Sequence, residues 1–239
     1  MLTHFSKALS YASRLERGIL AVFALAATSL FAFVYLADEV MEGSTRRFDT
    51  AVLLFFRNPQ DLSDPIGPRW FEEVMRDLTA LGGTTVLTLL TLFVTLFLIL
   101  SGKRRSAVLV ASSIVLGTIL STVLKLAFDR PRPELVPHGM EVYTLSFPSS
   151  HAMMSALVYL TLGALLARTQ ESVRVRVYLI SCAILLTFLI GVSRLYLGVH
   201  WPTDELAGWA VGSCWALLSW LLARRLQRKG PVEPPGVSK

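Results

Sequence analysis

The sequence is organised as long apolar runs separated by shorter polar segments. A helix needs roughly 20 predominantly apolar residues to cross the ~30 Å hydrocarbon core of a bilayer. Six runs meet or approach this length: Gly18 to Ala37, Thr84 to Leu100, Ala107 to Phe128, Ala152 to Ala167, Val177 to Leu197 and Leu206 to Ala223. This pattern predicts an all-α integral membrane protein, a bundle of six transmembrane helices that forms a single membrane domain over residues 1–239.

The first run resembles a signal peptide in two respects. It follows a basic start and contains Ala24-Leu25-Ala26, a sequence like a cleavage site. Its apolar character continues to Leu36, however, which is too long for the apolar core of a typical signal peptide. We therefore expect an uncleaved span.

Between the first two runs, the apolar spacing becomes that of an amphipathic helix. A short apolar stretch, Ala51 to Phe56, comes first, and after Pro68 the sequence RWFEEVMRDLTALGG repeats apolar residues every three or four positions. We expect a helix that Gly82-Gly83 terminates. Such helices usually lie in the membrane interface, which is the favoured interpretation here. A lid or lateral gate over a lipid site is the alternative.

The distribution of basic residues predicts the orientation. Hydrophobic residues make up 53% of the chain and charged residues 17%, and the net charge is +6. On a soluble protein this charge would suggest nucleic acid or another polyanion. However, 14 of the 23 basic residues, and three of the 17 acids, lie in four short or terminal segments on one side of the bundle. Their basic residues are Lys7, Arg14, Arg17, Lys103, Arg104, Arg105, Arg168, Arg174, Arg176, Arg224, Arg225, Arg228, Lys229 and Lys239.

By the positive-inside rule, these segments are cytoplasmic. We therefore expect cytoplasmic termini at residues 1–17 and 224–239, with a disordered tail from Gly230, and an extracytoplasmic segment at 38–83. The charge is then mainly a topology signal, and no nucleic-acid partner is expected.

The two cysteines, Cys182 and Cys214, lie in apolar runs, which excludes a disulfide framework or a cysteine-based zinc site.

The remaining polar residues near the spans gather at the opposite, extracytoplasmic boundary. Ionisable groups near a span are costly unless they are paired or functional. Singly, each has an ordinary explanation, such as a lysine that extends toward the interface. Together, three cations, two histidines and a carboxylate from three segments of the chain indicate one site. These residues are Lys125, Arg132, His151, Arg194, His200 and Asp204.

This set of residue types suits phosphoryl transfer. Fixed cations neutralise a phosphate dianion and the charge that develops on its oxygens. The turn Phe147-Pro148-Ser149-Ser150-His151 opens a predicted helix, whose N-terminal amides can bind an anion. Two histidines supply a nucleophile and an acid or base. Pro202 favours a helix start, so Asp204 can hold His200 in one tautomer.

Three short motifs resemble those of the type 2 phosphatidic acid phosphatase (PAP2) superfamily. Lys125 to Pro133 resembles its KxxxxxxRP motif, Pro148-Ser149-Ser150-His151 resembles PSGH, and Ser193 to Asp204 matches SRxxxxxHxxxD. The resemblance spans roughly residues 81–222. It implies a membrane phosphatase in which His200 attacks phosphorus and forms a phosphohistidine, with Asp204 as its orienting partner.

The resemblance also implies roles for the other motif residues. His151 would protonate the leaving oxygen and then activate water. The phosphate would be bound by Lys125, Arg132, Ser149, Arg194 and the backbone amide of Ser150. No metal or other cofactor is implied, and the sequence has no Asp/Glu cluster suited to Mg²⁺.

Two positions depart from this simple picture. Ser150 replaces the common glycine of the family; it keeps the backbone donor but would be strained at positive φ, and its hydroxyl offers a further contact. Arg130 precedes the motif arginine by two residues and is a candidate for steering an anionic substrate.

The expected function is hydrolysis of a lipid phosphate or diphosphate at the extracytoplasmic face of a bacterial inner membrane. Candidate substrates from the family are phosphatidate, phosphatidylglycerol phosphate, undecaprenyl diphosphate and lipid A phosphates. A soluble phosphoester is less favoured. Two alternatives stay open: a lipid-to-lipid phosphotransferase with the same site, and a non-catalytic transporter of anionic lipids.

Overall fold

The computed structural model describes residues 2–228, and the side chains of residues 16–225. The tail from Gly230, with Lys229 and Lys239, lies outside this range, as do the side chains of Lys7, Arg14 and Arg228. The described elements are α1 (Leu2–Glu42), α2 (Arg46–Phe55), β1 (Arg57–Asn58), β2 (Asp61–Pro65), α3 (Arg69–Leu81), α4 (Thr84–Leu100), α5 (Arg104–Phe128), α6 (Ser150–Arg168), α7 (Val173–Tyr196) and α8 (Pro202–Arg228).

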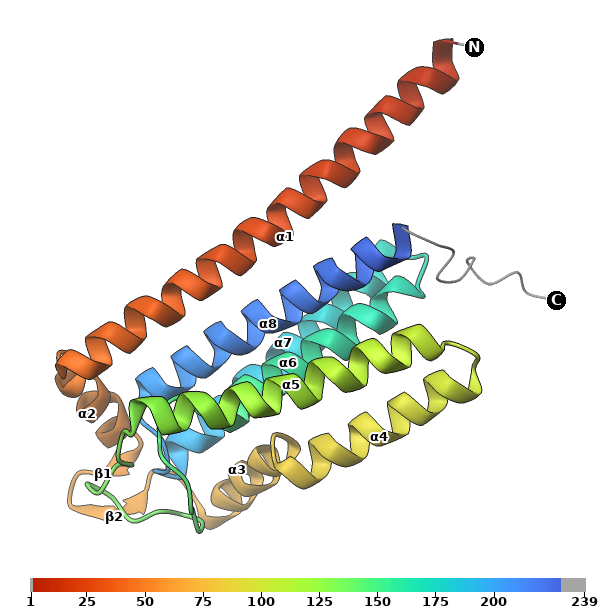
Figure 1. Ribbon diagram of the computed structural model, residues 1–239. Helices are drawn as coiled ribbons and strands as arrows, with labels where there is room; N and C mark the ends of the chain where they lie inside the picture. The colour runs from red at the N-terminus through yellow and green to blue at the C-terminus, as the bar shows by residue number, and fades with distance from the viewer. Residues whose placement is uncertain (1, 229–239) are drawn as a thin grey trace.

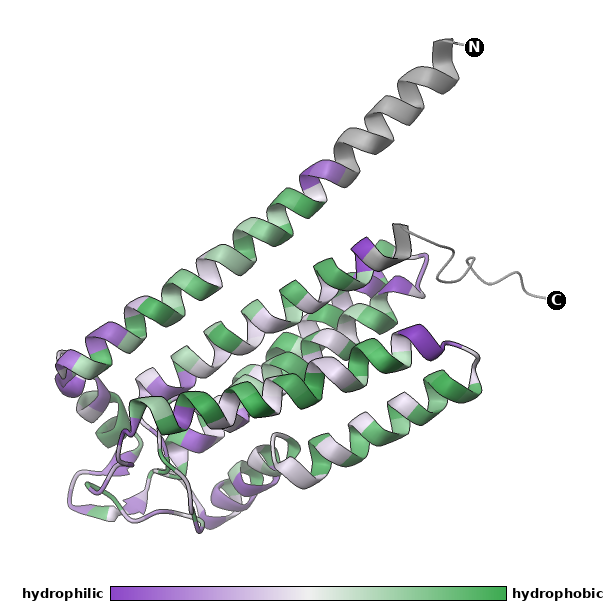
Figure 2. Ribbon diagram, in the orientation of Figure 1, coloured by the Kyte–Doolittle hydropathy of each residue, from purple (hydrophilic) through white to green (hydrophobic). Residues whose placement is uncertain are grey.

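Five of these helices, α1 and α5 to α8, are long and apolar enough to cross a membrane. The predicted second span, α4, has 17 residues and continues from α3 through a 45° bend at Gly82-Gly83; counted together, α3 and α4 provide a sixth crossing. Figure 2 shows apolar residues along these helices and hydrophilic ones concentrated near their ends. The protein is therefore a multi-pass, all-α membrane protein.

The helices α4 to α8 run side by side, and α1 inclines away from α8 toward its own N-terminus (Figure 1). The C-terminal part of α1 packs on the bundle, where Phe33, Ala37 and Val40 join Phe147 and Met153 in a buried cluster. The start of α1 and the end of α8 lie at the same end of the bundle as the α4–α5 and α6–α7 connections.

Two glycines bring α6 and α8 into close contact. A methyl group added at Gly208 would lie 2.7 Å from both the Ala152 Cβ and the Ser149 carbonyl oxygen. At Gly212, one turn further along α8, an added methyl group would lie even closer to the Met153 carbonyl oxygen. Small residues spaced by four let helix backbones approach within a membrane, and here they fix the first turns of α6 against α8.

The shorter elements gather at the other end of the bundle, which we call the motif end: the end where α5 and α7 finish and α6 and α8 begin (Figure 1). Here Arg57, only 3% exposed, donates a hydrogen bond to the Tyr196 carbonyl oxygen at 2.8 Å. The helix α3 ends at Leu81, as its glycines predict. Its apolar face is partly covered by protein, because Met75 packs with Tyr196 and Val199, whereas Trp70 stays 63% exposed.

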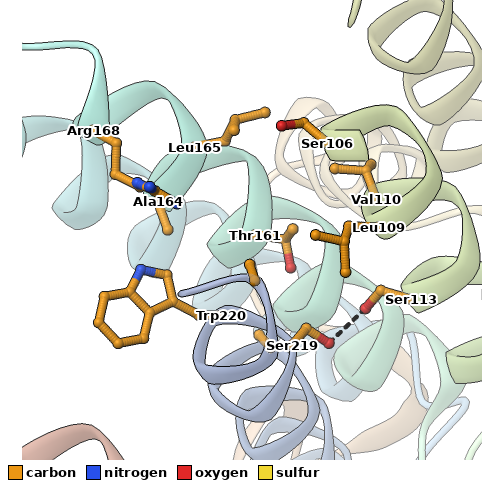
Figure 3. A pocket seen from close by; sticks show the side chains of 12 residues that line it. Ser106, Leu109, Val110, Ser113, Thr161, Ala164, Leu165, Arg168, Ser219 and Trp220 are labelled. Atoms are coloured by element: carbon orange, nitrogen blue, oxygen red, sulfur yellow. Dashed lines mark hydrogen bonds between the residues drawn. The ribbon is translucent and has the colours of Figure 1, made fainter. Parts of the chain in front are cut away.

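A narrow apolar crevice of about 70 Å³ opens at the opposite end, between α5, α6 and α8 (Figure 3). Leu109, Leu165 and Trp220 line it, and a 2.7 Å hydrogen bond joins the hydroxyls of Ser113 and Ser219 at its edge. Its lining includes one charged residue and neither histidine nor carboxylate, so it has no groups suited to phosphoryl chemistry.

Candidate active site

A cavity of about 400 Å³ lies at the motif end, between α4, α5, α6 and the 129–149 connection. Six of the predicted site residues line it: Lys125, Arg132, Ser150, His151, Arg194 and His200. Residues far apart in the sequence thus meet around one space, as the shared membrane depth of the motifs predicts.

Local backbone geometry turns the chain into this cavity. Asp129 ends α5 in the left-handed region, with φ of 44°, and so redirects the chain toward Arg132. Gly198, with φ of 72°, does the same after α7 and leads to His200. Left-handed residues commonly terminate helices. Pro202 then opens α8, which places Asp204 in its first turn.

His200 is held by a network that specifies its tautomer. Its Nδ1 lies 3.2 Å from the Asp204 Oδ2, and the same oxygen accepts hydrogen bonds from the Trp201 amide at 2.9 Å and from the Ser146 hydroxyl. An ionised carboxylate only accepts, so Nδ1 is assigned as the donor. The other ring nitrogen, Nε2, is left as the basic atom, 3.1 Å from Arg132 Nη1.

Burial and charge keep the His200 ring neutral. The residue is 1% exposed. Burial lowers the pKa of His200 well below its ordinary value, and the charges of Arg194, Arg132 and Lys125 lower it further. A neutral imidazole with an unprotonated Nε2 has the form that a nucleophile requires, and here that nitrogen accepts a hydrogen bond from Arg132 Nη1.

The guanidinium of Arg132 is fixed on two sides. Its Nε donates to the Thr144 carbonyl oxygen at 2.7 Å, and its Nη1 donates to the Val199 carbonyl oxygen at 2.5 Å. Burial lowers the pKa of Arg132, and the charge of Asp204 opposes that shift. The planar group is thereby presented to the cavity in a single orientation.

Lys125 and Arg194 complete the set of cations. Lys125 Nζ donates to the Leu145 and Ser146 carbonyl oxygens at 2.6 and 3.4 Å, which leaves one of its three protons for a ligand. Arg194, 2% exposed, contacts Thr79 Oγ1 at 3.3 Å, but its Nε has no hydrogen-bond partner among the described residues. A buried donor without a partner is costly, and an anion in the cavity would satisfy it.

The two serines of the second motif differ in placement. Ser150 lines the cavity, and its hydroxyl lies 2.9 Å from that of Ser121. Its φ is negative, since Asp129 alone among the described non-glycine residues has positive φ, so serine is unstrained in place of the family glycine. Ser149 is instead fully buried as the N-cap of α6, accepting from the Ala152 amide at 3.3 Å, and its hydroxyl does not line the cavity.

His151 reaches the cavity from the first turn of α6. The α3–α4 bend packs closely against it: a methyl group added at Gly82 would lie 3.3 Å from His151 Cδ2 and 2.5 Å from Ile190 Cγ2. Glycine at this bend therefore allows the backbone to approach the imidazole.

Arg130 does not line the cavity. Its two terminal nitrogens each form a 2.6 Å ion pair, one with Asp49 and one with Asp204. With its charge compensated on both sides, this residue is poorly suited to steering a substrate.

Several residues at the site have no clear signal in the sequence. Ser146 binds Asp204, Thr79 contacts Arg194, and Asp49 and Glu205 are fully buried at the motif end. Glu205 adjoins a motif residue, but an acid in the first turn of a helix is ordinarily explained by the helix dipole. The others become relevant only when distant segments meet.

Among the described residues, no group of three or more His, Cys, Asp or Glu side chains could hold a metal ion.

Comparisons with known proteins confirm the family resemblance that the three motifs indicate. The sequence profile of the PAP2 superfamily matches residues 106–228, just over half of the chain. The chain belongs to the PAP2 superfamily. Phosphatidylglycerophosphatase B of Bacillus subtilis is 34% identical over 148 residues, which cover 60% of this chain and 70% of that protein. An undecaprenyl-diphosphatase of Sulfolobus acidocaldarius is 29% identical over 146 residues, 58% of this chain and 63% of that protein.

A solved structure extends the similarity beyond the PAP2 motifs. The transmembrane PAP2 type phosphatidylglycerolphosphate phosphatase from Bacillus subtilis aligns with a TM-score of 0.74 at 26% identity, covering 85% of this chain and 98% of that one. This PAP2 protein is therefore a membrane-embedded phosphoric ester hydrolase whose relatives are lipid phosphatases, which disfavours the non-catalytic transporter.

Proposed function

We propose that this PAP2 protein hydrolyses the phosphate or diphosphate headgroup of a membrane lipid through a phosphohistidine intermediate, without a metal ion. The positive-inside bias of the sequence supports an extracytoplasmic site with both termini in the cytoplasm. Phosphatidylglycerol phosphate and undecaprenyl diphosphate are the substrates that the names of the two relatives favour.

The shape of the cavity is the observation that carries the proposal. Its cationic end holds Lys125, Arg132 and Arg194, and its lining continues to Leu87, Ile114 and Met154. Ile114 and Lys125 are eleven residues apart on α5, about 16 Å at the helical rise of 1.5 Å per residue. This is about half of the ~30 Å hydrocarbon thickness. A cavity that is cationic at one end and apolar at the other suits an amphiphile.

The first chemical step is attack on phosphorus by the lone pair of His200 Nε2. The bond from phosphorus to the lipid oxygen breaks, and His151, which takes up a proton once the anionic headgroup offsets the surrounding cations, gives that proton to the leaving oxygen. Asp204 stabilises the positive charge that forms on the attacking ring, and the three cations stabilise the equatorial oxygens.

The second step returns the enzyme to its starting state. Neutral His151 removes a proton from water, the oxygen of this water attacks the phosphorus of the phosphohistidine, and the P–N bond breaks. Inorganic phosphate leaves, or, for a diphosphate lipid, the same bond changes release one phosphate and the lipid monophosphate.

Purified protein in lipid micelles tests the proposal. We expect phosphate release from lipid phosphates to fall ~10³-fold or more in His200→Ala, as for loss of other nucleophiles. His138→Ala is the matched control, since His138 binds the Pro133 carbonyl oxygen and does not line the cavity. Substrate labelled on its phosphate should leave an alkali-stable label on the wild-type protein and none on His200→Ala. Undiminished turnover in His200→Ala would refute the mechanism.

A further inference from the structure

We propose that Asp49 of α2 is a positioning residue for the His200–Asp204 pair and acts through Arg130. The inference rests on the proposed function, because it concerns the nucleophile of that reaction. Asp49 lies outside residues 106–228, the part of the chain that the superfamily profile matches. The N-terminal region would then contribute to catalysis as well as to anchoring.

Arg130 forms a bridge between two buried carboxylates. Its Nη2 donates to Asp49 Oδ2 and its Nη1 to Asp204 Oδ1, each at 2.6 Å. Both carboxylates are fully buried, and the arginine side chain is 14% exposed. Bonds of this length between charged groups are the stronger kind of hydrogen bond. The position of Asp204 is thereby tied to that of Asp49.

Asp49 also holds the start of α8 directly. Its Oδ1 accepts from the Thr203 amide at 3.0 Å and from the Thr203 hydroxyl at 2.9 Å. Thr203 precedes Asp204, and the Thr203 hydroxyl in turn lies 2.8 Å from Arg130 Nη1. The Asp49 carboxylate therefore contacts both the arginine that pairs with Asp204 and the backbone amide of the residue that precedes Asp204.

The charges explain why this arrangement affects the nucleophile. Asp204 uses Oδ1 for Arg130 and Oδ2 for His200. If Arg130 had no second carboxylate, its whole positive charge would act on Asp204 and oppose the positive charge that forms on His200 during attack. Asp49 shares the charge of Arg130, so Asp204 keeps more of its negative charge for the imidazole.

A purely structural role is the competing explanation, because a buried ion pair also fastens α2 to α8. Such a role would change the amount and thermal stability of folded protein, but not the protonation of His200. Removing the negative charge of Asp49 should lower the pKa of His200, and removing the positive charge of Arg130 should raise it. The two substitutions are therefore expected to move the pH profile in opposite directions.

The test compares Asp49→Asn, Arg130→Gln and the double variant with Asp77→Asn, which removes the same charge from an exposed site on α3. We expect Asp49→Asn to lower kcat for phosphate release by ~10–100-fold, as changes to supporting groups do, with KM within about twofold. The acid limb of kcat/KM should shift to lower pH in Asp49→Asn and to higher pH in Arg130→Gln. Asp77→Asn should behave as the wild type.

The double variant provides the decisive comparison. If Asp49 acts through Arg130, Asp49→Asn should cause no further loss of kcat in the Arg130→Gln background. The same fold-loss in both backgrounds, or a loss of activity with an unshifted acid limb, would overturn the inference. If Asp49→Asn fails to fold, Arg130→Gln decides alone, and an acid limb that does not rise overturns it. Absence of turnover in the wild type would instead refute the proposed function.

Discussion

At the residue scale, the environment of His200 combines two opposing influences. Burial and three cations disfavour a protonated ring, while the Asp204 carboxylate lies 3.2 Å from its Nδ1. In the proposed mechanism, the ring is therefore neutral before the reaction, and Asp204 stabilises the positive charge that would form on it during attack on phosphorus. The motifs allow His200, Asp204 and the cations to be predicted from the sequence. Ser146 and Asp49 could not be predicted, because they lie 58 and 155 residues before Asp204 in the sequence and come near it only in the folded protein.

The depressed pKa of His200 predicts the acid side of the pH profile. A nucleophile must be unprotonated, and the pKa of this imidazole lies below its ordinary value of about 6.5. As the pH falls through 6.5, the ring stays neutral, so kcat/KM should not decline there on account of His200. We would measure kcat/KM from pH 5 to 8 and correct for the separately titrated second ionisation of the substrate phosphate. A remaining inflection near pH 6.5 would contradict the prediction.

Substitution of Ser150 by glycine should lower the stability of the protein while leaving its activity nearly unchanged. Ser150→Gly restores the residue common in the family, keeps the backbone amide and removes the hydrogen bond to Ser121. We expect kcat within about threefold of wild type, together with a free energy of unfolding lower by about 1–2 kcal/mol, from glycine at a helix start and the lost bond. Ser121→Ala is the matched control for the bond alone. A large loss of kcat in Ser150→Gly would mean that the hydroxyl contacts the substrate.

At the element scale, helices with strong local signals were predictable and short elements were not. Proline, serine and glycine mark the starts of α6 and α8 and the end of α3. The strands β1 and β2 are too short and polar to show a period of two. Residues 129–149 have no regular structure in which a pattern could appear. Their course depends on contacts such as those of Arg132 with Thr144, which form only when the helices assemble.

The α3–α4 bend predicts sensitivity to a single methyl group. Gly82→Ala would place Cβ against Ile190 and the His151 ring, so the bend must move away from α6 or displace the imidazole. Because misplacement by about 1 Å can cost up to ~10²-fold in rate, we expect kcat to fall by roughly 10-fold. Gly18→Ala is the control, since nothing lies within 4 Å of its added methyl group. Wild-type activity in Gly82→Ala would show that the bend does not position His151.

At the scale of the whole molecule, the arrangement of helix ends predicts a sidedness that labelling can measure. The α4–α5 and α6–α7 connections lie at the end opposite the motif end. In the orientation that we propose from the basic residues of those connections, Ser63 of β2 should lie on the extracytoplasmic side and Ser101, after α4, on the cytoplasmic side. Both serines are exposed.

A cysteine pair makes this test direct. In a Cys182→Ala, Cys214→Ala background, a thiol reagent that cannot cross membranes should label Ser63→Cys in intact spheroplasts. It should label Ser101→Cys only after lysis. The reverse pattern would place the cavity on the cytoplasmic side and contradict the proposed orientation.

The close contact of α6 and α8 has a consequence for how relatives diverge. Gly208 and Gly212 bring the backbones of these helices into close contact, so His151 and Asp204 are carried on one tightly packed pair. The cavity wall made by Leu87 and Thr88 belongs to α4, which is bent away from α3 and lies outside the profile match. Selection for a new lipid substrate should therefore alter α3 and α4 first. We expect relatives with different lipid substrates to keep the α6–α8 contact and to differ in the sequence and tilt of α4.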